Sequence, residues 1–428
     1  MIRRRCFFVF IILFILSLVK ITLLIQRIAN RAGGAERVVV NVANQLSRNG
    51  AKVEVLAFET TDGRPFYPLD CAVDYRNLGI MSLEGPTGFE RRRRAITKWF
   101  QTRSKFPLLG RLAWHRVYGQ SVKRLRAHLE SQPSDLLIAF LPSSFTITAK
   151  VAENLGLPFI LSCHNVPEED FENPERWDQN PVDKIRRLES LRRADAITVI
   201  LPEFRDWFPE KIRGKVHVIR NFITRPPVSY PPLGGRTKRI LAVGRYSTPK
   251  DHETLLRAWN LIAKDFPDWV VEIYGEGPLG CKLNGIIDQL GIQSSTTLHP
   301  PSSEVWDLYG DSRIFCIPSI FEGFGLVTAE AMACGTPAVG FKSCPGTNRI
   351  ILDGETGVLV DCPNDQKVPR LAEALKQLML DEPLCQRYAT RSLAEAESYF
   401  VENRIADWFA LVDSIDSAKA PRNSTTQA

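Results

Sequence analysis

The sequence predicts an α/β protein built from two doubly wound parallel sheets that face a central cleft. Short apolar runs alternate with helical stretches along most of the chain, which is typical of parallel strands covered by helices. This alternation stops once, in a segment rich in Pro and Gly, and then restarts. The 428 residues suffice for two or three domains with separate cores. A composition of 44% hydrophobic and 24% charged residues excludes a mainly disordered chain.

The first half opens with a buried strand at 21–25, which leads through Gly33 and Gly34 into a helix at about 35–49. Valines at helical spacing predict this helix, and Gly50 is a natural stop. Further strands are expected at 53–58, 136–140, 159–162 and 196–200.

The interruption covers 221–236 and contains Pro226, Pro227, Pro231 and Pro232, so it continues neither a helix nor a central strand. Strands are then expected at 239–243, 269–274, 314–317, 337–341 and 358–360. Helices are expected near 252–266, from 326, and within 368–380 and 384–412.

These patterns predict six segments in chain order. They are an apolar extension at 1–19, a Rossmann-like domain at 20–222, a linker at 223–238, a second Rossmann-like domain at 239–395, a helix at 396–415 that packs back on the first domain, and a disordered tail at 416–428. The apolar run at 6–19 follows three arginines and is shorter than the roughly 20 residues that span a bilayer. We interpret it as a membrane-associated helix; a signal-peptide core, a spanning anchor and a misassigned start codon are the alternatives.

The net charge of +7 is concentrated in one segment, because residues 91–126 contain twelve Lys or Arg and no acid. Such a run is usually a solvated helix face. Its interleaved aromatic residues instead favour docking on an anionic membrane. The residues expected to dock are Arg91, Arg92, Arg93, Arg94, Trp99 and Trp114. Nucleic-acid binding is not favoured, because the sequence lacks a recognised binding motif.

The nine cysteines form no CxxC pair and no Cys/His cluster, so we expect reduced thiols in a cytosolic chain and no metal centre. No pair of aspartates follows a strand in the pattern that holds a metal–diphosphate complex.

The most informative stretch is 318–337, where a buried strand ends in a loop carrying Glu322 and a helix carries Glu330. Glycines allow a close ligand approach, and a helix start attracts anions. Since a phosphate would repel carboxylates, Glu322 and Glu330 suit the hydroxyl groups of two polyol moieties that flank a phosphate. The alternatives for Glu330 are a solvated residue or a first-turn residue that stabilises the helix dipole, but a buried unpaired Glu is costly.

A second loop follows the strand at 239–243 and carries Arg245 and Lys250, whose charges suit a diphosphate. Exposed cations after a strand are usually only solvated, and the Glu322 loop in the same domain favours the functional interpretation. In the first half, Gly34 could approach a phosphate, although Gly33-Gly34 is neither a GxGxxG nor a Walker motif. His164 follows a strand end and is either a functional or a structural loop histidine.

The chain resembles the retaining glycosyltransferases of family 4, with the two-Rossmann architecture called GT-B, from about residue 20 to 400. The resemblance is carried by Gly33-Gly-Ala-Glu-Arg37, Gly244-Arg245 with Lys250, Gly275-Glu-Gly-Pro278, Glu322-Gly-Phe-Gly-Leu326, Glu330-Ala-Met-Ala-Cys-Gly335 and Asp353-Gly-Glu-Thr-Gly357.

The resemblance implies that residues 20–222 form the acceptor domain and residues 239–395 the nucleotide-sugar domain. It also implies roles for single positions. Glu322, with Gly323 and the amides of Phe324, Gly325 and Leu326, would contact the donor sugar, and Glu330 the ribose. Arg245 and Lys250 would neutralise the diphosphate in place of a metal. Gly34 would approach the phosphate, and His164 would lie near the transferred sugar.

The implied reaction is metal-independent transfer, with retention, of a hexose or N-acetylhexosamine. The donor would be a nucleotide sugar with uridine diphosphate as carrier, and no cofactor is expected. The acceptor would be a glycan or polyprenyl-diphosphate-linked acceptor in bacterial surface-polysaccharide synthesis at the inner face of the membrane. The alternatives are a nucleotide-sugar epimerase or hydrolase of the same fold, and a non-catalytic nucleotide-sugar-binding partner.

Overall fold

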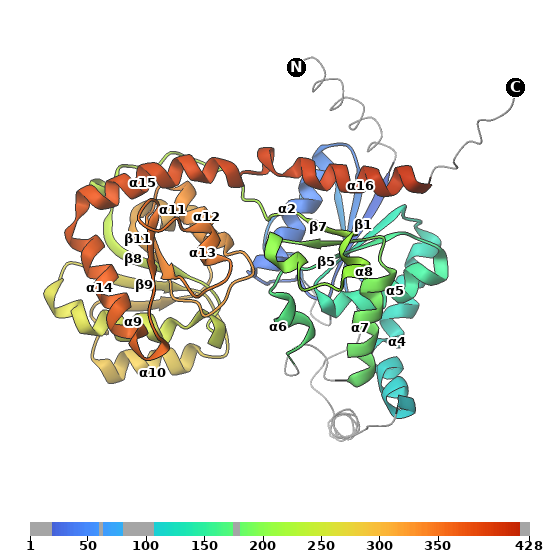
Figure 1. Ribbon diagram of the computed structural model, residues 1–428, viewed down its shortest axis with the longest axis horizontal. Helices are drawn as coiled ribbons and strands as arrows, with labels where there is room; N and C mark the ends of the chain where they lie inside the picture. Colours follow the sequence, from blue (N-terminus) through green and yellow to red (C-terminus); the bar gives the residue numbers. More distant parts are fainter. Residues whose placement is uncertain (1–18, 60–62, 80–106, 174–179, 420–428) are drawn as a thin grey trace, which may run out of the picture. The chain divides into compact units, whose positions relative to one another are not determined.

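The computed structural model describes residues 19–59, 63–79, 107–173 and 180–419 (Figure 1). The chain divides into two compact units, one comprising residues 1–220 and 405–428 and the other residues 221–404. We call these unit 1 and unit 2.

Unit 1 is built on a seven-stranded parallel sheet with the strand order β3-β2-β1-β4-β5-β6-β7. Its strands are β1 (Lys20–Ile25), β2 (Lys52–Ala57), β3 (Val73–Asn77), β4 (Leu136–Phe140), β5 (Phe159–Ser162), β6 (Ala196–Val199) and β7 (Val216–Val218). The helices are α2 (Gly34–Arg48), α4 (Pro107–Ser131), α5 (Pro142–Leu155), α6 (Pro167–Phe171), α7 (Pro181–Arg193), α8 (Glu210–Arg213) and α16 (Ile405–Lys419).

The central strands β4, β5 and β6 are buried at every position, because helices cover both faces of the sheet. The sequence predicted these strands closely. It missed β3 and β7, which lie at the two edges and carry half-exposed polar residues. An edge strand needs no continuous apolar run, so it leaves a weaker pattern.

Helix α16 belongs to unit 1, although it follows the whole of unit 2 in the sequence. Its Trp408 is buried and stacks on Phe140 of β4, with ring centroids 6.2 Å apart. The helix continues to Lys419, whereas the sequence predicted a disordered tail from residue 416.

Unit 2 is a six-stranded parallel sheet with the order β10-β9-β8-β11-β12-β13. Its strands are β8 (Thr237–Val243), β9 (Val270–Tyr274), β10 (Thr296–His299), β11 (Ser312–Ile317), β12 (Ala338–Phe341) and β13 (Gly357–Val360). The helices are α9 (His252–Ile262), α10 (Gly280–Leu290), α11 (Val305–Asp311), α12 (Leu326–Ala333), α13 (Thr347–Ile350), α14 (Lys367–Leu380) and α15 (Glu382–Ala396).

The two faces of this sheet have separate apolar cores. Alternate residues of β8 show the division, since Ile240 and Ala242 join one cluster and Leu241 joins the other. The second cluster includes Tyr309 of α11 and Ala331 of α12, so these helices cover the same face of the sheet.

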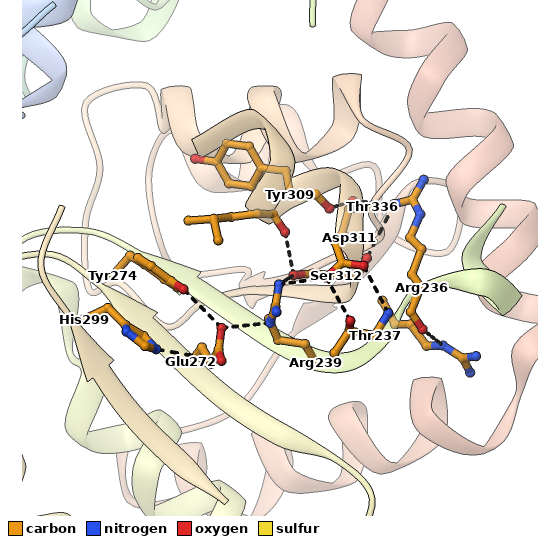
Figure 2. A network of polar contacts seen from close by, with 12 residues as sticks. Arg236, Thr237, Arg239, Glu272, Tyr274, His299, Tyr309, Asp311, Ser312 and Thr336 are labelled. Carbon is orange, nitrogen blue, oxygen red and sulfur yellow. Dashed lines mark hydrogen bonds and ion pairs between the residues drawn. The ribbon is translucent and has the colours of Figure 1, made fainter. Parts of the chain in front are cut away.

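The Pro-rich segment packs within unit 2. Arg236 is buried, and its guanidinium donates to the carbonyl oxygens of Pro231 and Cys334, each at 2.8 Å. It also donates to Thr336 Oγ1 at 2.9 Å (Figure 2). Strand β8 begins directly afterwards at Thr237, inside the segment predicted to be a linker.

Candidate functional site

Two loops of unit 2 meet at the carboxyl edge of its sheet. Strands β8 and β11 are neighbours in the sheet, and their loops begin at Gly244 and Pro318. The amide of Ile320 donates to the carbonyl oxygen of Pro249 at 2.8 Å, which ties the loops together. Ligands of open parallel sheets bind at this edge.

The tie brings a cation and a carboxylate into contact. Lys250 Nζ lies 2.5 Å from Glu322 Oε1, and Ser319 Oγ donates to the same oxygen at 2.7 Å. Glu322 is only 9% exposed, whereas the Lys250 side chain is 23% exposed. The ion pair and the Ser319 hydroxyl therefore stabilise a charge that is largely removed from water.

A third loop, which contains Pro345 and Gly346, contacts the backbone of Glu322. Glu322 N donates to Pro345 O at 3.2 Å, and Gly346 adopts a φ of +81°. A Cβ atom at Gly346 would lie 2.7 Å from the backbone oxygen of Glu322, so only glycine permits this approach. In the same loop, burial raises the pKa of the Cys344 thiol to about 11, which keeps that thiol neutral.

Helix α12 starts at the Glu322 loop. Gly325 precedes it with a φ of +87°, a conformation that favours glycine. In the part of the chain that the structure describes, the amides of Phe324, Gly325 and Leu326 donate no hydrogen bond to another group. Together with Gly323 they form a short run of backbone at a helix N-terminus, which is suited to oxygen ligands.

Glu330 lies in α12 and is 1% exposed. Tyr309 of α11 donates its hydroxyl to Glu330 Oε2 at 3.1 Å. The expected burial of this glutamate is confirmed, and the alternative of a solvated side chain is wrong. Sequence reasoning missed Tyr309, because its only signal is an aromatic residue on a short helix ahead of β11.

Arg245 is exposed, and it forms no ion pair or side-chain hydrogen bond with the described residues. Its neighbour Tyr246 holds the loop in place, because the Tyr246 hydroxyl donates toward the carbonyl oxygens of Ile273 and His299 at 2.9 and 2.6 Å. Burial raises the pKa of Tyr246 to about 12, so the hydroxyl stays protonated as a donor.

His252 begins α9 directly below this loop and is 4% exposed. Its Nε2 atom lies 3.3 Å from the carbonyl oxygen of Gly244. Burial lowers the pKa of His252 to about 4, with a further contribution from the positive charge of Lys250. The ring is therefore neutral near pH 7 and supports the Arg245–Lys250 loop without adding charge.

A polar network joins the strands of unit 2 beside the second core cluster (Figure 2). Arg239 of β8 pairs with Glu272 of β9 at 2.9 Å and with Asp311 at 3.4 Å. The Tyr274 hydroxyl donates to Glu272, and the ring of Tyr274 stacks on His299 with centroids 4.4 Å apart. These contacts fix the carboxyl ends of β9 and β10 next to the loop that Tyr246 anchors.

Unit 1 holds the two remaining predicted residues. Gly34 is exposed and is the first residue of α2. His164 follows β5, is 7% exposed, and stacks on Phe140 with ring centroids 5.2 Å apart. Its Nε2 atom lies 2.8 Å from Ser162 Oγ, which in turn contacts Thr198 Oγ1 at 2.7 Å. The histidine ring is thus held in one orientation.

The membrane-docking prediction is wrong for Trp114. Its side chain is fully buried, its Nε1 donates to Asp183 Oδ1 at 2.9 Å, and Arg186 lies over its ring. The aromatic residue belongs to the inner face of α4, whereas the cations Arg116 and Lys123 lie on the outer face and Arg111 is exposed. Arg91, Arg92, Arg93, Arg94 and Trp99 lie outside the described residues.

The described residues contain neither a membrane-spanning helix nor a cluster of metal ligands. None of the helices there combines the length and the hydrophobicity needed to cross a bilayer. No three His, Cys, Asp or Glu side chains within the described ranges cluster as metal ligands would.

Comparison with known families gives two matches that follow the two units. The family described as Glycosyltransferase Family 4 matches residues 32–225, and the family described as Glycosyl transferases group 1 matches residues 231–393.

Individual relatives and structures agree with these matches. The chain is 26% identical over 391 residues to an uncharacterized glycosyltransferase of Haemophilus influenzae, covering 91% of this chain and 98% of the relative. It is 23% identical to an undecaprenol-diphosphate-linked glycan α-1,4-N-acetyl-D-galactosaminyltransferase of Campylobacter jejuni, covering 94% and 100%. The structure of Anabaena HepE in complex with UDP and glucose superposes with a TM-score of 0.70 at 18% identity, covering 93% and 100%. This last similarity shows the fold.

Proposed function

The chain belongs to the family 4 glycosyltransferases of the GT-B fold, and on this premise we propose that it transfers a hexose or an N-acetylhexosamine from a UDP-sugar to a hydroxyl group. The acceptor in this proposal is a glycan or a polyprenyl-diphosphate-linked glycan. The transfer retains the anomeric configuration and needs no metal ion. The contact between Lys250 and Glu322 at the carboxyl edge of unit 2 is the observation that carries the proposal.

In the proposed donor complex, Lys250 and Arg245 neutralise the diphosphate. Arg245 is exposed and has no carboxylate partner among the described residues, so its forked donors are available to phosphate oxygens. Lys250 is partly exposed and can reach the same ligand while it remains near Glu322. As the bond from sugar to phosphate breaks, negative charge grows on the leaving diphosphate, and fixed cations stabilise it. Two cations take the role that a metal would otherwise have.

Glu322 would accept hydrogen bonds from the hydroxyl groups of the transferred sugar. One of its oxygens already accepts from Ser319 and Lys250, so the other remains available for a ligand in this proposal. The backbone amides of Phe324, Gly325 and Leu326 would donate to ligand oxygens next to it. Groups that accept hydrogen bonds and groups that donate them thus lie on one short loop, which suits a sugar attached to a phosphate.

Glu330 would hold the ribose, with Tyr309 fixing the position of its carboxylate. In unit 1 we assign Gly34 to a contact with the donor phosphate and His164 to one with the transferred sugar. The hydrogen bond with Ser162 and the stacking on Phe140 hold the His164 ring in one orientation, as such a contact requires.

For the chemical step we propose a front-face route through an oxocarbenium-like transition state. The bond between the anomeric carbon and the phosphate oxygen breaks, and the acceptor oxygen attacks from the same side. The acceptor hydroxyl passes its proton to the departing phosphate oxygen, so charge and protons balance without a separate base. Both ends of this transfer lie on the substrates, and the protein supplies orientation and charge stabilisation.

The Campylobacter relative acts on a glycan carried by undecaprenol diphosphate, and this supports a lipid-linked acceptor in surface-polysaccharide synthesis. We place the enzyme at the inner face of the cell membrane. The cysteines in the described ranges are free thiols, as in proteins of a reducing compartment.

The test is an assay of the purified full chain with a panel of UDP-sugars, with and without a lipid-diphosphate acceptor and with a chelator present. Proton NMR of the product would report the anomeric configuration. We expect acceptor-dependent transfer with retention that the chelator does not abolish. Turnover of the donor at the same rate without acceptor would instead identify a hydrolase or epimerase.

A further inference from the structure

Three helices of unit 1 form a hollow on the surface of that unit. Helices α4, α5 and α7 pack against one another (Figure 1) and line an open hollow of about 440 Å³. Its charged lining comprises Arg111, Lys150, Arg186 and Arg193 together with the acids Glu153 and Glu189. We call this hollow the α4–α5–α7 groove. The groove belongs to unit 1, whereas the loops that carry Lys250 and Glu322 belong to unit 2.

Most of the positive charge in the groove has no ion-pair partner among the described residues. Glu153 pairs with Arg193, so these two charges offset each other. Arg111, Lys150 and Arg186 form no ion pair with any described residue, and Glu189 is the remaining acid of the lining.

The buried carboxylate of Asp183 does not balance this charge, because both of its oxygens already have partners. Asp183 Oδ1 accepts from Trp114 Nε1 at 2.9 Å and from Thr146 Oγ1 at 3.1 Å. Its other oxygen lies 3.0 Å from Arg187 Nε. The groove therefore keeps an excess of cations over its whole lining.

Arg186 has a fixed position and an available hydrogen-bond donor, as ligand binding requires. Its guanidinium carbon lies 3.8 Å from the centroid of the Trp114 ring, which holds the guanidinium in place. Its Nη1 atom is buried and makes no hydrogen bond within the described part of the chain. A buried donor without an acceptor is unfavourable, and an anion in the groove would satisfy it.

The surrounding electrostatics agree with this geometry. Burial lowers the pKa of Arg186; among the nearby charges, Asp183 and Glu189 raise it and Arg111 lowers it. Burial also lowers the pKa of His115, which lines the groove, and the charges of Arg186 and Lys150 lower it further. The positive charges of Arg111, Lys150 and Arg186 therefore lie close enough to lower the pKa values of neighbouring groups.

One large exposed apolar side chain belongs to the same lining as these cations. Ile185 is 56% exposed in the lining, whereas Leu188, three residues further along α7 at 37% exposure, lies outside the lining. On α4, Leu112 follows Arg111 and is 67% exposed. An exposed aliphatic residue beside cations that have no ion-pair partner among the described residues matches a ligand that is anionic at one end and apolar at the other.

We propose that the α4–α5–α7 groove binds a phosphate group carried on an aliphatic chain. Phosphate offers several acceptor oxygens to the forked donors of Arg111 and Arg186 and to the point charge of Lys150. The chain would lie over Ile185. A membrane phospholipid and a lipid-linked acceptor share this chemistry, and the second source rests on the proposed function.

The first experiment measures binding of dihexanoyl phosphatidic acid, below its micelle concentration, to the full chain by isothermal titration calorimetry. Arg111→Gln and Lys150→Gln should each weaken binding by about tenfold, the effect of losing one charge-assisted contact. Both side chains are exposed, so these variants should fold. Matched controls are Arg116→Gln and Lys123→Gln on the outer face of α4, which lie outside the lining.

The proposal predicts weaker binding of glycerol 3-phosphate, which lacks the chain, and of dihexanoyl phosphatidylcholine, which lacks the net charge. Equal affinity of groove and control variants would overturn it, as would phosphatidylcholine binding as tight as that of phosphatidic acid.

Two further measurements distinguish the sources. Loss of co-sedimentation with phosphatidylglycerol vesicles in the groove variants identifies a membrane phospholipid. A raised KM for a lipid-diphosphate acceptor, with unchanged KM for the donor, identifies the acceptor. The calorimetry uses no donor, so a chain that binds phosphatidic acid but transfers no sugar would contradict the proposed function and leave the groove assignment standing.

Discussion

The ammonium group of Lys250 contacts the carboxylate of Glu322 at 2.5 Å, although 72 positions separate the two residues in the sequence. Each residue neutralises the other in a position where Glu322 is nearly buried. When a diphosphate binds beside Lys250, the positive charge of Lys250 would interact with both the diphosphate and Glu322. The pair therefore links the cation proposed for the leaving group to the carboxylate proposed for the sugar.

The first prediction concerns this cation. Lys250→Gln should lower kcat by about 100-fold, because a fixed charge that stabilises the leaving group in the transition state is lost. Steady-state kinetics with the active UDP-sugar would measure it. Lys250→Arg keeps the charge and should retain more activity than Lys250→Gln. Equal kcat for all three proteins would contradict the assignment.

Glu322→Gln should lower kcat/KM by about 10- to 100-fold, because hydrogen bonds from sugar hydroxyls to a charged acceptor are stronger than those to an amide. The same kinetics report the change. Glu355→Gln is the matched control, since Glu355 is exposed and pairs with Arg391 at 3.2 Å on the surface of unit 2. If both variants behave like the parent, Glu322 does not contact the substrate.

Tyr309→Phe removes the hydroxyl that donates to the buried Glu330. We expect the free energy of unfolding to fall by about 1–2 kcal/mol, because a buried carboxylate oxygen loses a partner. The donor KM should also rise if Glu330 holds the ribose. Urea unfolding and donor titration measure the two effects. Loss of stability without any change in KM would limit Tyr309 and Glu330 to a structural role.

The buried His252 predicts a pH dependence of stability. Burial lowers its pKa from 6.5 to about 4 in the folded chain, so the unfolded chain binds the proton more readily between these values. Stability from this group is present above pH 6.5 and is lost as the pH falls toward 4, by about 3 kcal/mol in total. Urea unfolding at several pH values, compared with His252→Gln, isolates the effect. Identical pH slopes for the two proteins would show that His252 is not the source.

Trp408→Ala should destabilise unit 1 by about 3–5 kcal/mol, because a large buried ring that stacks on Phe140 leaves a cavity. Chemical unfolding followed by circular dichroism measures the change. Asp407→Ala replaces an exposed neighbour on the same helix and should have little effect. Equal stability of the two variants would mean that α16 contributes little to unit 1.

The sequence determined the central strands and most of the motif positions. β4 and β5 are predicted with correct bounds because parallel strands covered on both faces need apolar side chains throughout. The glutamates and cations were identified because their residue types follow strand ends, where parallel sheets place their ligands.

Other features depended on packing that local sequence does not encode. The edge strands β3, β7 and β10 carry polar residues on an exposed face, so their apolar pattern is interrupted. Trp114 lies within a run of cations, yet helical periodicity turns its ring inward onto Asp183 and Arg186. Tyr309 reaches Glu330 across 21 positions.

The difference between the features that the sequence predicts and those that it does not has one physical cause. Whether a residue enters a strand or a helix is decided largely by neighbours along the chain, and those are printed in the sequence. Which side chains meet, as Lys250 meets Glu322 or Arg186 meets Trp114, is decided by how separate elements pack. Only the folded chain fixes those contacts, because they depend on distances between segments that the sequence leaves far apart.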